Sequence, residues 1–441
     1  STNNNTLSQV LANNTGLTSL AKSGAGTWIL SGTNTYSGGT TISSGTLKLG
    51  VGTTCGSGTS CTSGSNTTLY SSAVGTGTVI VNAGGTLDLN GYKLGDANAS
   101  TNPALTLAGS STAVAQLINS ASGVNGSAAI YSTITLAQNG ADYYDVIAQV
   151  TNTNTNVFTV AGTIIDGAGS TASKLQVGNT GYAGTVIFGG TNTYTGGTKI
   201  AAGTLKIASG GTSGSNLSTG TLTISGGTLI DTATSTISNT VILATGSNEI
   251  AAANSQSATF TGAISGAGTG SLNIGDSSNT GAVIFGGVNT FTGGTTVGGG
   301  SLSTGDIFIG ANNGSWSTAS NWSMNLAPIS GTAYGVIINS GSTVNYDTAA
   351  TASISNIITN NGTISFSGSS NVTLSGAISG NGAINTASSY TGTVTLSGTN
   401  SYTGGTTISA GTLVASTSAS ALGSSTVTLG ASSGNTSATL Q

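Results

Sequence analysis

The residues of this chain that could take part in catalysis are few and widely spaced. The sequence of 441 residues contains no histidine and no arginine. A Ser-His-Asp or Cys-His nucleophile and a histidine metal centre are therefore excluded. Only Asp142 and Asp145 lie close together in sequence, and in a strand this spacing directs them to opposite faces. The acidic residues are Asp88, Asp96, Asp142, Asp145, Asp166, Asp231, Asp276, Asp306, Asp347 and Glu249.

Carboxylates that are distant in sequence could still meet between turns of a fold. A suitably spaced pair would support glycoside hydrolysis, and a carboxylate cluster would bind the calcium that polysaccharide lyases need. The sequence shows no acidic cluster, and Asp276 and Asp347 are typical of turns closed by side-chain hydrogen bonds. We therefore expect no enzyme, no catalytic residue, no cofactor and no metal, with a polysaccharide-active enzyme as the minor alternative.

The cysteines and lysines indicate the compartment and exclude one class of partner. Cys55 and Cys61 lie in the segment TTCGSGTSC, and loop cysteines without a nearby histidine make poor zinc ligands. A small disulfide-closed loop in an oxidising compartment is the interpretation that we favour. The six lysines are scattered, so a nucleic-acid partner is not expected. No apolar run approaches the ~18 residues of a transmembrane helix, so we expect no membrane insertion by this segment.

Composition favours strands over helices. Glycine accounts for 72 residues, and only 4% of residues are charged. Glycine, serine, threonine and asparagine all disfavour helices, through backbone entropy or competing side-chain hydrogen bonds. Regular valine, isoleucine and leucine positions argue against disorder. The sequence therefore predicts many short strands joined by tight turns in which glycine and asparagine adopt positive φ.

One block occurs four times and aligns without gaps. It reads TWILSGTNTYSGGTTISSGTLKL at 27–49, TVIFGGTNTYTGGTKIAAGTLKI at 185–207, AVIFGGVNTFTGGTTVGGGSLST at 282–304 and TVTLSGTNSYTGGTTISAGTLVA at 393–415. A period of two predicts three short strands per block. The expected inward residues of the first strand are Trp28 and Leu30, Val186 and Phe188, Val283 and Phe285, and Val394 and Leu396. The second strand is centred on Ile42, Ile200, Val297 or Ile408. The third places Leu47 and Leu49, or Leu205 and Ile207, inward.

Between the first two strands of each block lies an Asn-x-aromatic-x-Gly-Gly segment. We expect these residues to have a structural role in the repeat. They are Asn34, Tyr36, Gly38, Gly39, Asn192, Tyr194, Gly196, Gly197, Asn289, Phe291, Gly293, Gly294, Asn400, Tyr402, Gly404 and Gly405.

Such a block cannot bury its own apolar face and must stack on copies of itself. With about 20–25 residues per coil and strands about 4.8 Å apart, we expect about 18–22 coils. The prediction is an all-β fold in which residues 1–441 form one continuous parallel β-helix, or β-solenoid. The segments 50–66, 95–160 and 306–335 are expected to be rich in loops or irregular.

Two further segments stand out. A Gly-x-Ile-x-Gly marker appears as GAISGAG at 262–268, GAISGNG at 376–382 and, more loosely, GTIIDGAG at 162–169. The segment WSTASNWSMNLAPIS at 316–330 holds two of the three tryptophans. We interpret the second segment as a coil with a projecting loop whose aromatic side chains cover the solenoid, with an exposed aromatic ligand platform as the alternative.

The pattern Asn-Thr-Tyr-Thr-Gly-Gly-Thr-x-Ile-x-x-Gly-Thr-Leu at 192–205 and in its sister blocks resembles the passenger-associated transport repeat of autotransporter passenger domains. The Gly-Ala-Ile-Ser-Gly-x-Gly marker is similar to the segment that precedes that repeat in many such passengers. The resemblance implies export through the outer membrane and a right-handed parallel β-helix that folds outside the cell and is displayed on its surface. We expect no translocator barrel within this chain.

The leading functional expectation is an adhesive or interaction shaft that binds a cell-surface or matrix ligand through the segments 50–66, 95–160 or 306–335. The alternative is a structural protein whose copies assemble end to end into a filament or surface layer, because no cap for the exposed strand edges is evident at 420–441. Ice binding through threonine arrays, suggested by TNTNTNVFTV at 151–160, is a further minor alternative.

Overall fold

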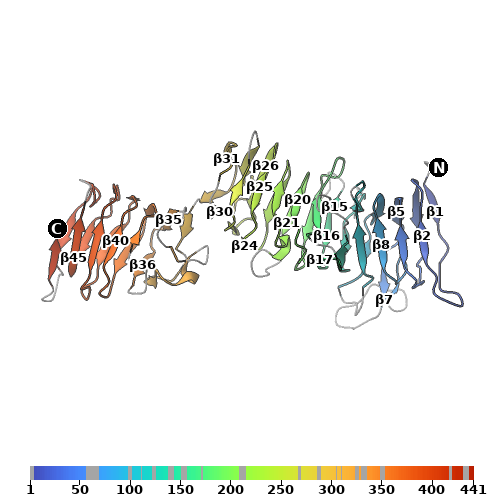
Figure 1. Cartoon of the computed structure of the whole chain (residues 1–441), viewed down its shortest axis with the longest axis horizontal. Helices are drawn as coiled ribbons and strands as arrows, with labels where there is room; N and C mark the ends of the chain where they lie inside the picture. Colours follow the sequence, from blue (N-terminus) through green and yellow to red (C-terminus); the bar gives the residue numbers. More distant parts are fainter. Residues whose placement is uncertain are drawn as a thin grey trace. The chain divides into compact units, whose positions relative to one another are not determined.

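The structure is a computed structural model in which the chain forms two compact units (Figure 1). Unit 1 comprises residues 1–258, 262–283 and 289–301, and unit 2 comprises residues 259–261, 284–288 and 302–441. The described residues are 4–55, 69–97, 102–110, 112–121, 126–137, 144–149, 156–169, 172–207, 215–266, 270–285, 290–303, 305–308, 310–322, 327–328, 335–347, 353–416, 420–430 and 437–441. Among these residues no helix is long and apolar enough to cross a membrane.

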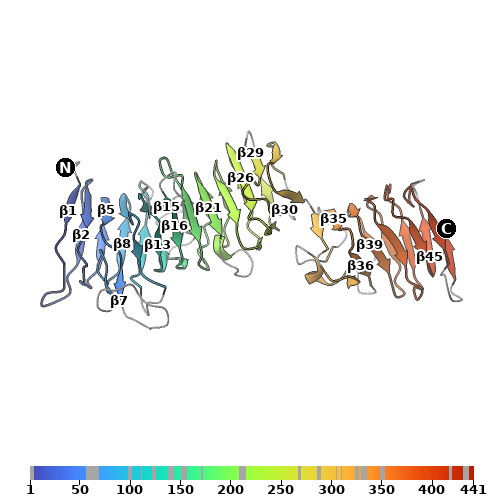
Figure 2. The same cartoon turned by 180° about the vertical axis from the view of Figure 1, so that it is seen from behind.

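Unit 1 is built around three parallel sheets, which we number I to III (Figures 1 and 2). Sheet I contains, in spatial order, β1 (Asn5–Leu7), β3 (Thr27–Leu30), β5 (Gly45–Leu49), β9 (Gly85–Asp88), β12 (Gln116–Asn119), β15 (Tyr144–Gln149), β18 (Lys174–Val177), β20 (Thr198–Ile200), β22 (Leu222–Ile224), β25 (Val241–Leu243) and β28 (Ile264–Ser265). Sheet II contains β10 (Lys93–Leu94), β13 (Ala128–Ile130), β16 (Val157–Val160), β19 (Thr185–Phe188), β21 (Thr204–Ile207), β23 (Thr228–Asp231), β26 (Ser247–Ala252), β29 (Ser271–Ile274) and β31 (Thr295–Val297). Sheet III contains β17 (Ile164–Asp166), β14 (Ile134–Leu136), β11 (Leu105–Ala108), β8 (Val79–Asn82), β4 (Thr40–Ile42) and β2 (Leu20–Lys22).

The remaining elements of residues 1–303 are short. They are β6 (Thr54–Cys55), β7 (Leu69–Ser71), β24 (Ser235–Ile237), β27 (Ser257–Phe260), β30 (Ala282–Phe285), β32 (Ser301–Ser303) and the 3-10 turn η1 (Ser215–Leu217). The strands β6 and β7 pair antiparallel, outside the three stacked sheets. Cys61 and the side chain of Cys55 lie outside the described residues, so the disulfide stays a prediction.

Unit 2 repeats the architecture with three parallel sheets of its own, IV to VI. Sheet IV contains β33 (Gly305–Ile307), β35 (Gly335–Ile338), β38 (Ile358–Asn360) and β41 (Ile378–Ser379). Sheet V contains β34 (Gly314–Ser315), β36 (Thr343–Tyr346), β39 (Thr363–Phe366), β42 (Ala383–Thr386), β44 (Thr406–Ile408) and β46 (Val427–Leu429). Sheet VI contains β37 (Ser353–Ile354), β40 (Val372–Leu374), β43 (Thr393–Leu396), β45 (Gly411–Ala415) and β47 (Ala438–Leu440), and η2 (Ala319–Asn321) is a 3-10 turn.

The alternation read from the sequence explains how the strands bury their apolar residues. In β21, Leu205 and Ile207 are buried, whereas Thr204 and Lys206 between them are half-buried on the outer face. Each strand pairs with the equivalent strand of the next turn, so aliphatic side chains of successive turns stack into one narrow core. The predicted parallel β-solenoid is therefore confirmed, and its right-handed sense stays a prediction.

The number of turns is lower than we expected. The described residues form about 15 turns, whereas the sequence had suggested about 18–22. The turn of the first block is short, because Thr27 pairs with Thr46 only 19 residues later. The next turn takes 40 residues, from Gly45 to its partner Gly85. Long connections between strands therefore consume residues without adding turns. The expectation of one continuous winding over residues 1–441 stays a prediction.

Unit 2 begins with a cluster of aromatic side chains. Trp316 and Trp322 are buried, with ring centroids 4.9 Å apart, and Phe308 lies 5.4 Å from Trp322. The indole of Trp316 donates to the Pro328 carbonyl at 3.1 Å, so its only polar atom is paired. Tyr346, 5.0 Å from Trp316, continues the aromatic stack into the core of the unit. These tryptophans are core residues, so the alternative of an exposed aromatic platform is wrong.

Candidate functional site

The repeated Asn-x-aromatic segment forms a buried corner at which three successive turns are joined. In the first, second and fourth blocks the asparagine side chain is 1–3% exposed. Its Oδ1 accepts a hydrogen bond from a backbone N–H of the preceding turn, and its Nδ2 donates to a backbone carbonyl of the following turn. The acceptor contacts are Leu11 N to Asn34, Ile164 N to Asn192 and Ile378 N to Asn400, each at 2.8 Å. The donor contacts are Asn34 to Ala73 O, Asn192 to Asn216 O and Asn400 to Ala421 O, each at 2.6 Å. We call this arrangement the asparagine bridge.

The aromatic residue two positions later anchors the same corner. Tyr194 is fully buried, and its hydroxyl lies 2.5 Å from Thr198 Oγ1, which itself donates to the Leu217 carbonyl at 3.2 Å. Because the threonine proton is used by that carbonyl, the tyrosine hydroxyl is the donor of the pair. Burial raises the pKa of Tyr194 to about 12, so the phenol stays protonated. The same pair forms between Tyr36 and Thr40 and between Tyr402 and Thr406, in both cases at 2.6 Å.

The two glycines that follow are required by backbone contact and conformation. A Cβ on Gly196 would lie 2.0 Å from the Ala172 carbonyl oxygen of the preceding turn. Gly197 has a φ of +98°, and a Cβ there would lie 2.3 Å from the Thr221 carbonyl oxygen of the next turn. Side chains are therefore excluded on both sides of this corner.

The third block departs from this geometry. Asn289 lies outside the described residues, Phe291 has no hydroxyl to donate, and Gly294 has open space around it and no positive φ. Val297, on the second strand of this block, is 50% exposed, whereas the equivalent Ile42, Ile200 and Ile408 are buried. Its strand, β31, is the last in the order of sheet II, so no further strand of that sheet covers the side chain.

The Gly-x-Ile-x-Gly marker occupies the turn directly before the corners of the second, third and fourth blocks. The isoleucines of the marker present their backbone groups to the Asn-x-aromatic segment of the next turn. The contacts are Thr193 N to Ile164 O, Thr290 N to Ile264 O and Ser401 N to Ile378 O, each at 2.8 Å. The Gly-x-Ile-x-Gly marker and the Asn-x-aromatic segment therefore lie on neighbouring turns at the same corner. Their separation in sequence does not reveal this.

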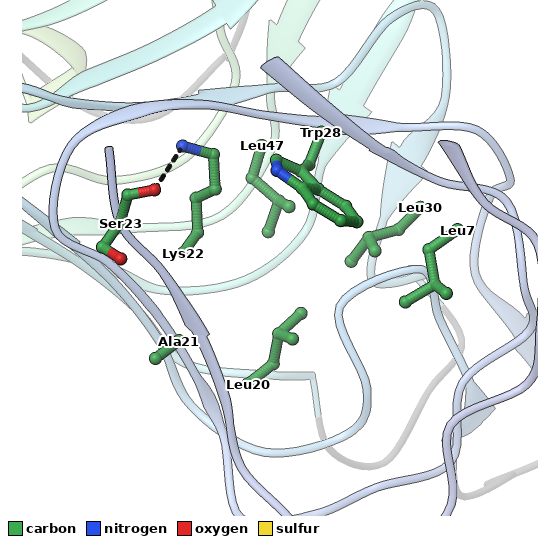
Figure 3. A pocket seen from close by; sticks show the side chains of 8 residues that line it. All are labelled: Leu7, Leu20, Ala21, Lys22, Ser23, Trp28, Leu30 and Leu47. Atoms are coloured by element: carbon green, nitrogen blue, oxygen red, sulfur yellow. Dashed lines mark hydrogen bonds between the residues drawn. The ribbon is translucent and has the colours of Figure 1, made fainter. Parts of the chain in front are cut away.

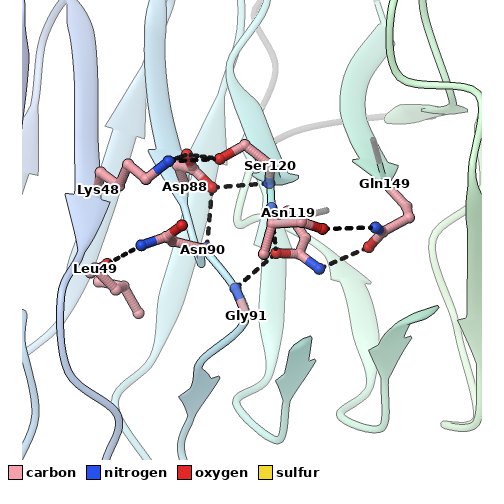
Figure 4. Close-up of polar contacts among 9 residues, drawn as sticks. Lys48, Leu49, Asp88, Asn90, Gly91, Asn119, Ser120 and Gln149 are labelled. Atoms are coloured by element: carbon pink, nitrogen blue, oxygen red, sulfur yellow. Dashed lines mark hydrogen bonds and ion pairs between the residues drawn. The ribbon is translucent and has the colours of Figure 1, made fainter. Parts of the chain in front are cut away.

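The carboxylates that could have been catalytic are used for contacts between turns or within loops. Asp88 pairs with Lys48 at 3.4 Å and accepts hydrogen bonds from the backbone and hydroxyl of Ser120 at 3.0 and 2.5 Å (Figure 4). Beside this pair, Asn119 donates to Gln149 at 2.7 Å, and both amides are fully buried. The Lys48 side chain is 24% exposed. This network links four successive turns of sheet I.

The other candidate acids are dispersed. Asp142 lies outside the described residues, and Asp145 faces the core, where its Oδ1 accepts from the Ala115 N–H at 3.1 Å. Asp276 closes its own turn by accepting from the backbone N–H groups of Ser278 and Asn279. Over the described part of the chain, no group of three or more His, Cys, Asp or Glu residues could hold a metal ion.

Two acids, the buried Asp231 and the half-buried Glu249, should make unit 1 more stable in acid. Burial raises the pKa of Asp231, which is fully buried, and the pKa of Glu249. A carboxyl whose pKa is raised in the folded state adds stability below its unfolded pKa of about 4 and loses it as pH rises through the folded pKa. We expect the urea midpoint of unit 1 to be higher at pH 4 than at pH 7, measured by circular dichroism. The double variant Asp231→Asn, Glu249→Gln should flatten this dependence, and a lower midpoint at pH 4 in the parent chain would contradict the assignment.

A pocket of about 280 Å³ lies within the first turns of unit 1 (Figure 3). Its apolar walls include Leu30, Leu47 and Trp28. Lys22 also lines it, and its ammonium donates to the carbonyls of Gly24 and Ser44 at 2.6 and 2.9 Å. Burial lowers the pKa of this lysine. Trp28 was predicted to be interior but is 40% exposed, and its partner on the first strand of the sheet, β1, is the polar Asn5.

Comparison with known proteins identifies the repeat. The model of the passenger-associated transport repeat matches residues 20–49, 182–207, 278–303 and 389–415, about a quarter of the chain. Each match overlaps one of the four blocks; the third match ends one residue before its block does. No curated protein and no solved structure matches the chain.

Proposed function

We propose that this chain, whose four passenger-associated transport repeats and β-solenoid fit an autotransporter passenger domain, is displayed on the cell surface as a non-catalytic shaft for adhesion or cell-surface interaction. The repeat family implies export to the cell surface. The observation that supports a shaft is the use made of the repeat residues. Asparagine, tyrosine and glycine at each regular corner are buried in contacts between turns, so they stiffen the solenoid and present no reactive group.

The outer faces and the connections between strands are therefore left to carry interactions. The segments 50–66, 95–160 and 306–335 each include connections between strands. Lengthening a connection costs little stability in a solenoid, because each turn depends chiefly on its neighbours. We assign ligand contact to these connections.

Adhesion by cells that display the parent protein tests this function. Residues 56–66 and, in separate variants, 150–155 and 329–334 would each be replaced by a Gly-Ser linker of equal length. At least one replacement should remove binding to host cells or matrix while circular dichroism and surface display stay unchanged. The matched control replaces residues 208–214, which connect β21 to η1 outside these segments. Unchanged adhesion in all three variants would refute the assignment.

A further inference from the structure

The carboxyl-terminal part of unit 2 carries no charge. Residues 348–441 contain no aspartate, glutamate, lysine, arginine or histidine. The charges of this chain, whose net value is −4, all lie before this segment. A surface built from these residues has no ionic means of recognising a ligand, and it would have to desolvate any charge that a ligand brought to it.

On sheet VI the outward side chains of this segment form hydroxyl columns in register. Ser353 pairs with Thr373, which pairs with Thr395 on the next turn. A second column joins Thr393, Thr412 and Thr439. Within a column, residues on successive turns are about 4.8 Å apart along the solenoid. Neighbouring outward residues of one strand are about 6.6 Å apart. Sheet VI thus presents two hydroxyl columns, each three turns long, which meet at β43; beyond β43 the first column is continued by Val414.

A groove borders these columns. It has a volume of about 400 Å³ and is lined by Ser388, Ser389, Thr391, Thr412 and Thr439 above the buried ring of Tyr390. The groove forms because β42 and β43 are joined by the long connection 387–392, whereas β44 and β45 of the next turn are joined by only two residues. Gly411 permits this step, since a Cβ there would lie 2.6 Å from the Tyr390 ring.

We infer that the hydroxyl columns of sheet VI and the adjoining groove bind an extended, uncharged β-1,4-linked polysaccharide that runs along the solenoid axis. The spacing of turns is close to the rise of one sugar residue in such a chain, so successive sugars meet equivalent hydroxyls on successive turns. An uncharged polyol satisfies these hydroxyls by hydrogen bonds and brings no charge to desolvate. The connection 387–392 projects beside the groove, so the surface is not flat. A polysaccharide chain can lie in such a groove, whereas the flat face of an ice crystal cannot contact it closely.

This inference rests on the proposed function only in placing the chain where it meets extracellular polysaccharide. Its test uses the purified full chain and measures retention on microcrystalline cellulose and on chitin, with alginate beads as the anionic control. We expect retention on at least one neutral polymer, none on alginate, and no change between low salt and 1 M NaCl. A salt-sensitive or alginate-specific interaction would overturn the inference.

The double variant Thr373→Glu, Thr395→Glu places two carboxylates in one column and should weaken retention by about tenfold or more. The matched control, Thr106→Glu, Thr135→Glu, makes the same change at two outward, registered positions of sheet III in unit 1. Circular dichroism checks that both variants fold.

Equal retention of both variants, or no retention of the parent chain, would refute the inference. Thermal hysteresis that only the sheet VI variant loses, without retention on either polymer, would refute it in favour of ice. If the polysaccharide inference fails but the sheet VI variant still supports cell adhesion, the proposed function is unaffected and only the assignment of a ligand to sheet VI is wrong.

Discussion

Replacing Asn400 by alanine should lower the free energy of unfolding of unit 2 by about 2–5 kcal/mol. The change removes the asparagine bridge of the fourth block. It leaves the Ile378 N–H and the Ala421 carbonyl unpaired at a site where the asparagine is only 3% exposed. Each buried group without a partner costs about 1–3 kcal/mol. The loss therefore exceeds that of an ordinary surface hydrogen bond.

Denaturation in urea, followed by tryptophan fluorescence, measures this loss. Trp316 and Trp322 are buried in the core of unit 2, and a Trp28→Phe background removes the signal from unit 1. The control is Asn385→Ala, which truncates the same residue type on the outer face of β42. This control should lower the free energy of unfolding by less than about 0.5 kcal/mol. Similar shifts for the two variants would mean that the bridge contributes nothing beyond an exposed amide.

Gly197→Ala should destabilise the middle of unit 1 by about 3 kcal/mol or more. The residue adopts a φ of +98°, which costs an L-residue about 1–2 kcal/mol. The new methyl group would also lie 2.3 Å from the Thr221 carbonyl oxygen, so the next turn must move. Displacement of a turn breaks ladder hydrogen bonds on both sides, which adds to the backbone strain.

Hydrogen exchange of the amides of β18, β20 and β22 measures this effect locally. The third block supplies the control, because Gly294 occupies the equivalent position with open space and without positive φ. Gly294→Ala should change the free energy of local opening in its own turn, as measured by hydrogen exchange, by less than about 1 kcal/mol. If both variants behaved alike, the left-handed corner would not be the cause of the repeat's glycine requirement.

The strands and their inward residues could be read from the sequence, because a period of two requires only local information. Val186, Phe188, Val394 and Leu396 are buried as expected. The first strand of a block pairs with its third strand, as Val186 does with Leu205, so one block makes one turn of the solenoid.

Other features depend on what stands in the neighbouring turn and could not be predicted. Trp28 was expected to be interior, yet it is exposed and pairs with the polar Asn5 on β1. Val297 is exposed on the strand that comes last in the order of sheet II. The number of turns was overestimated because nothing in the composition of a connection states how many residues it uses. The tryptophans of 316–330 carried a composition signal for a ligand platform, but packing against Tyr346 places them in a core.

The corner residues were recognised as structural, whereas their partners were not. Asn192 bonds to Ile164 and to the Asn216 carbonyl, which are 28 and 24 residues away. These distances vary between blocks, so no fixed spacing marks them. The Gly-x-Ile-x-Gly marker was the available signal, since it identifies the turn that supplies the N–H group.

Gly45 and Gly85 pair in register although 40 residues separate them, and a neighbouring turn needs only 19. The sequence and length of the chain between β5 and β9 can therefore change while these two strands keep their pairing. The same property makes this connection an entry point for engineered epitope display.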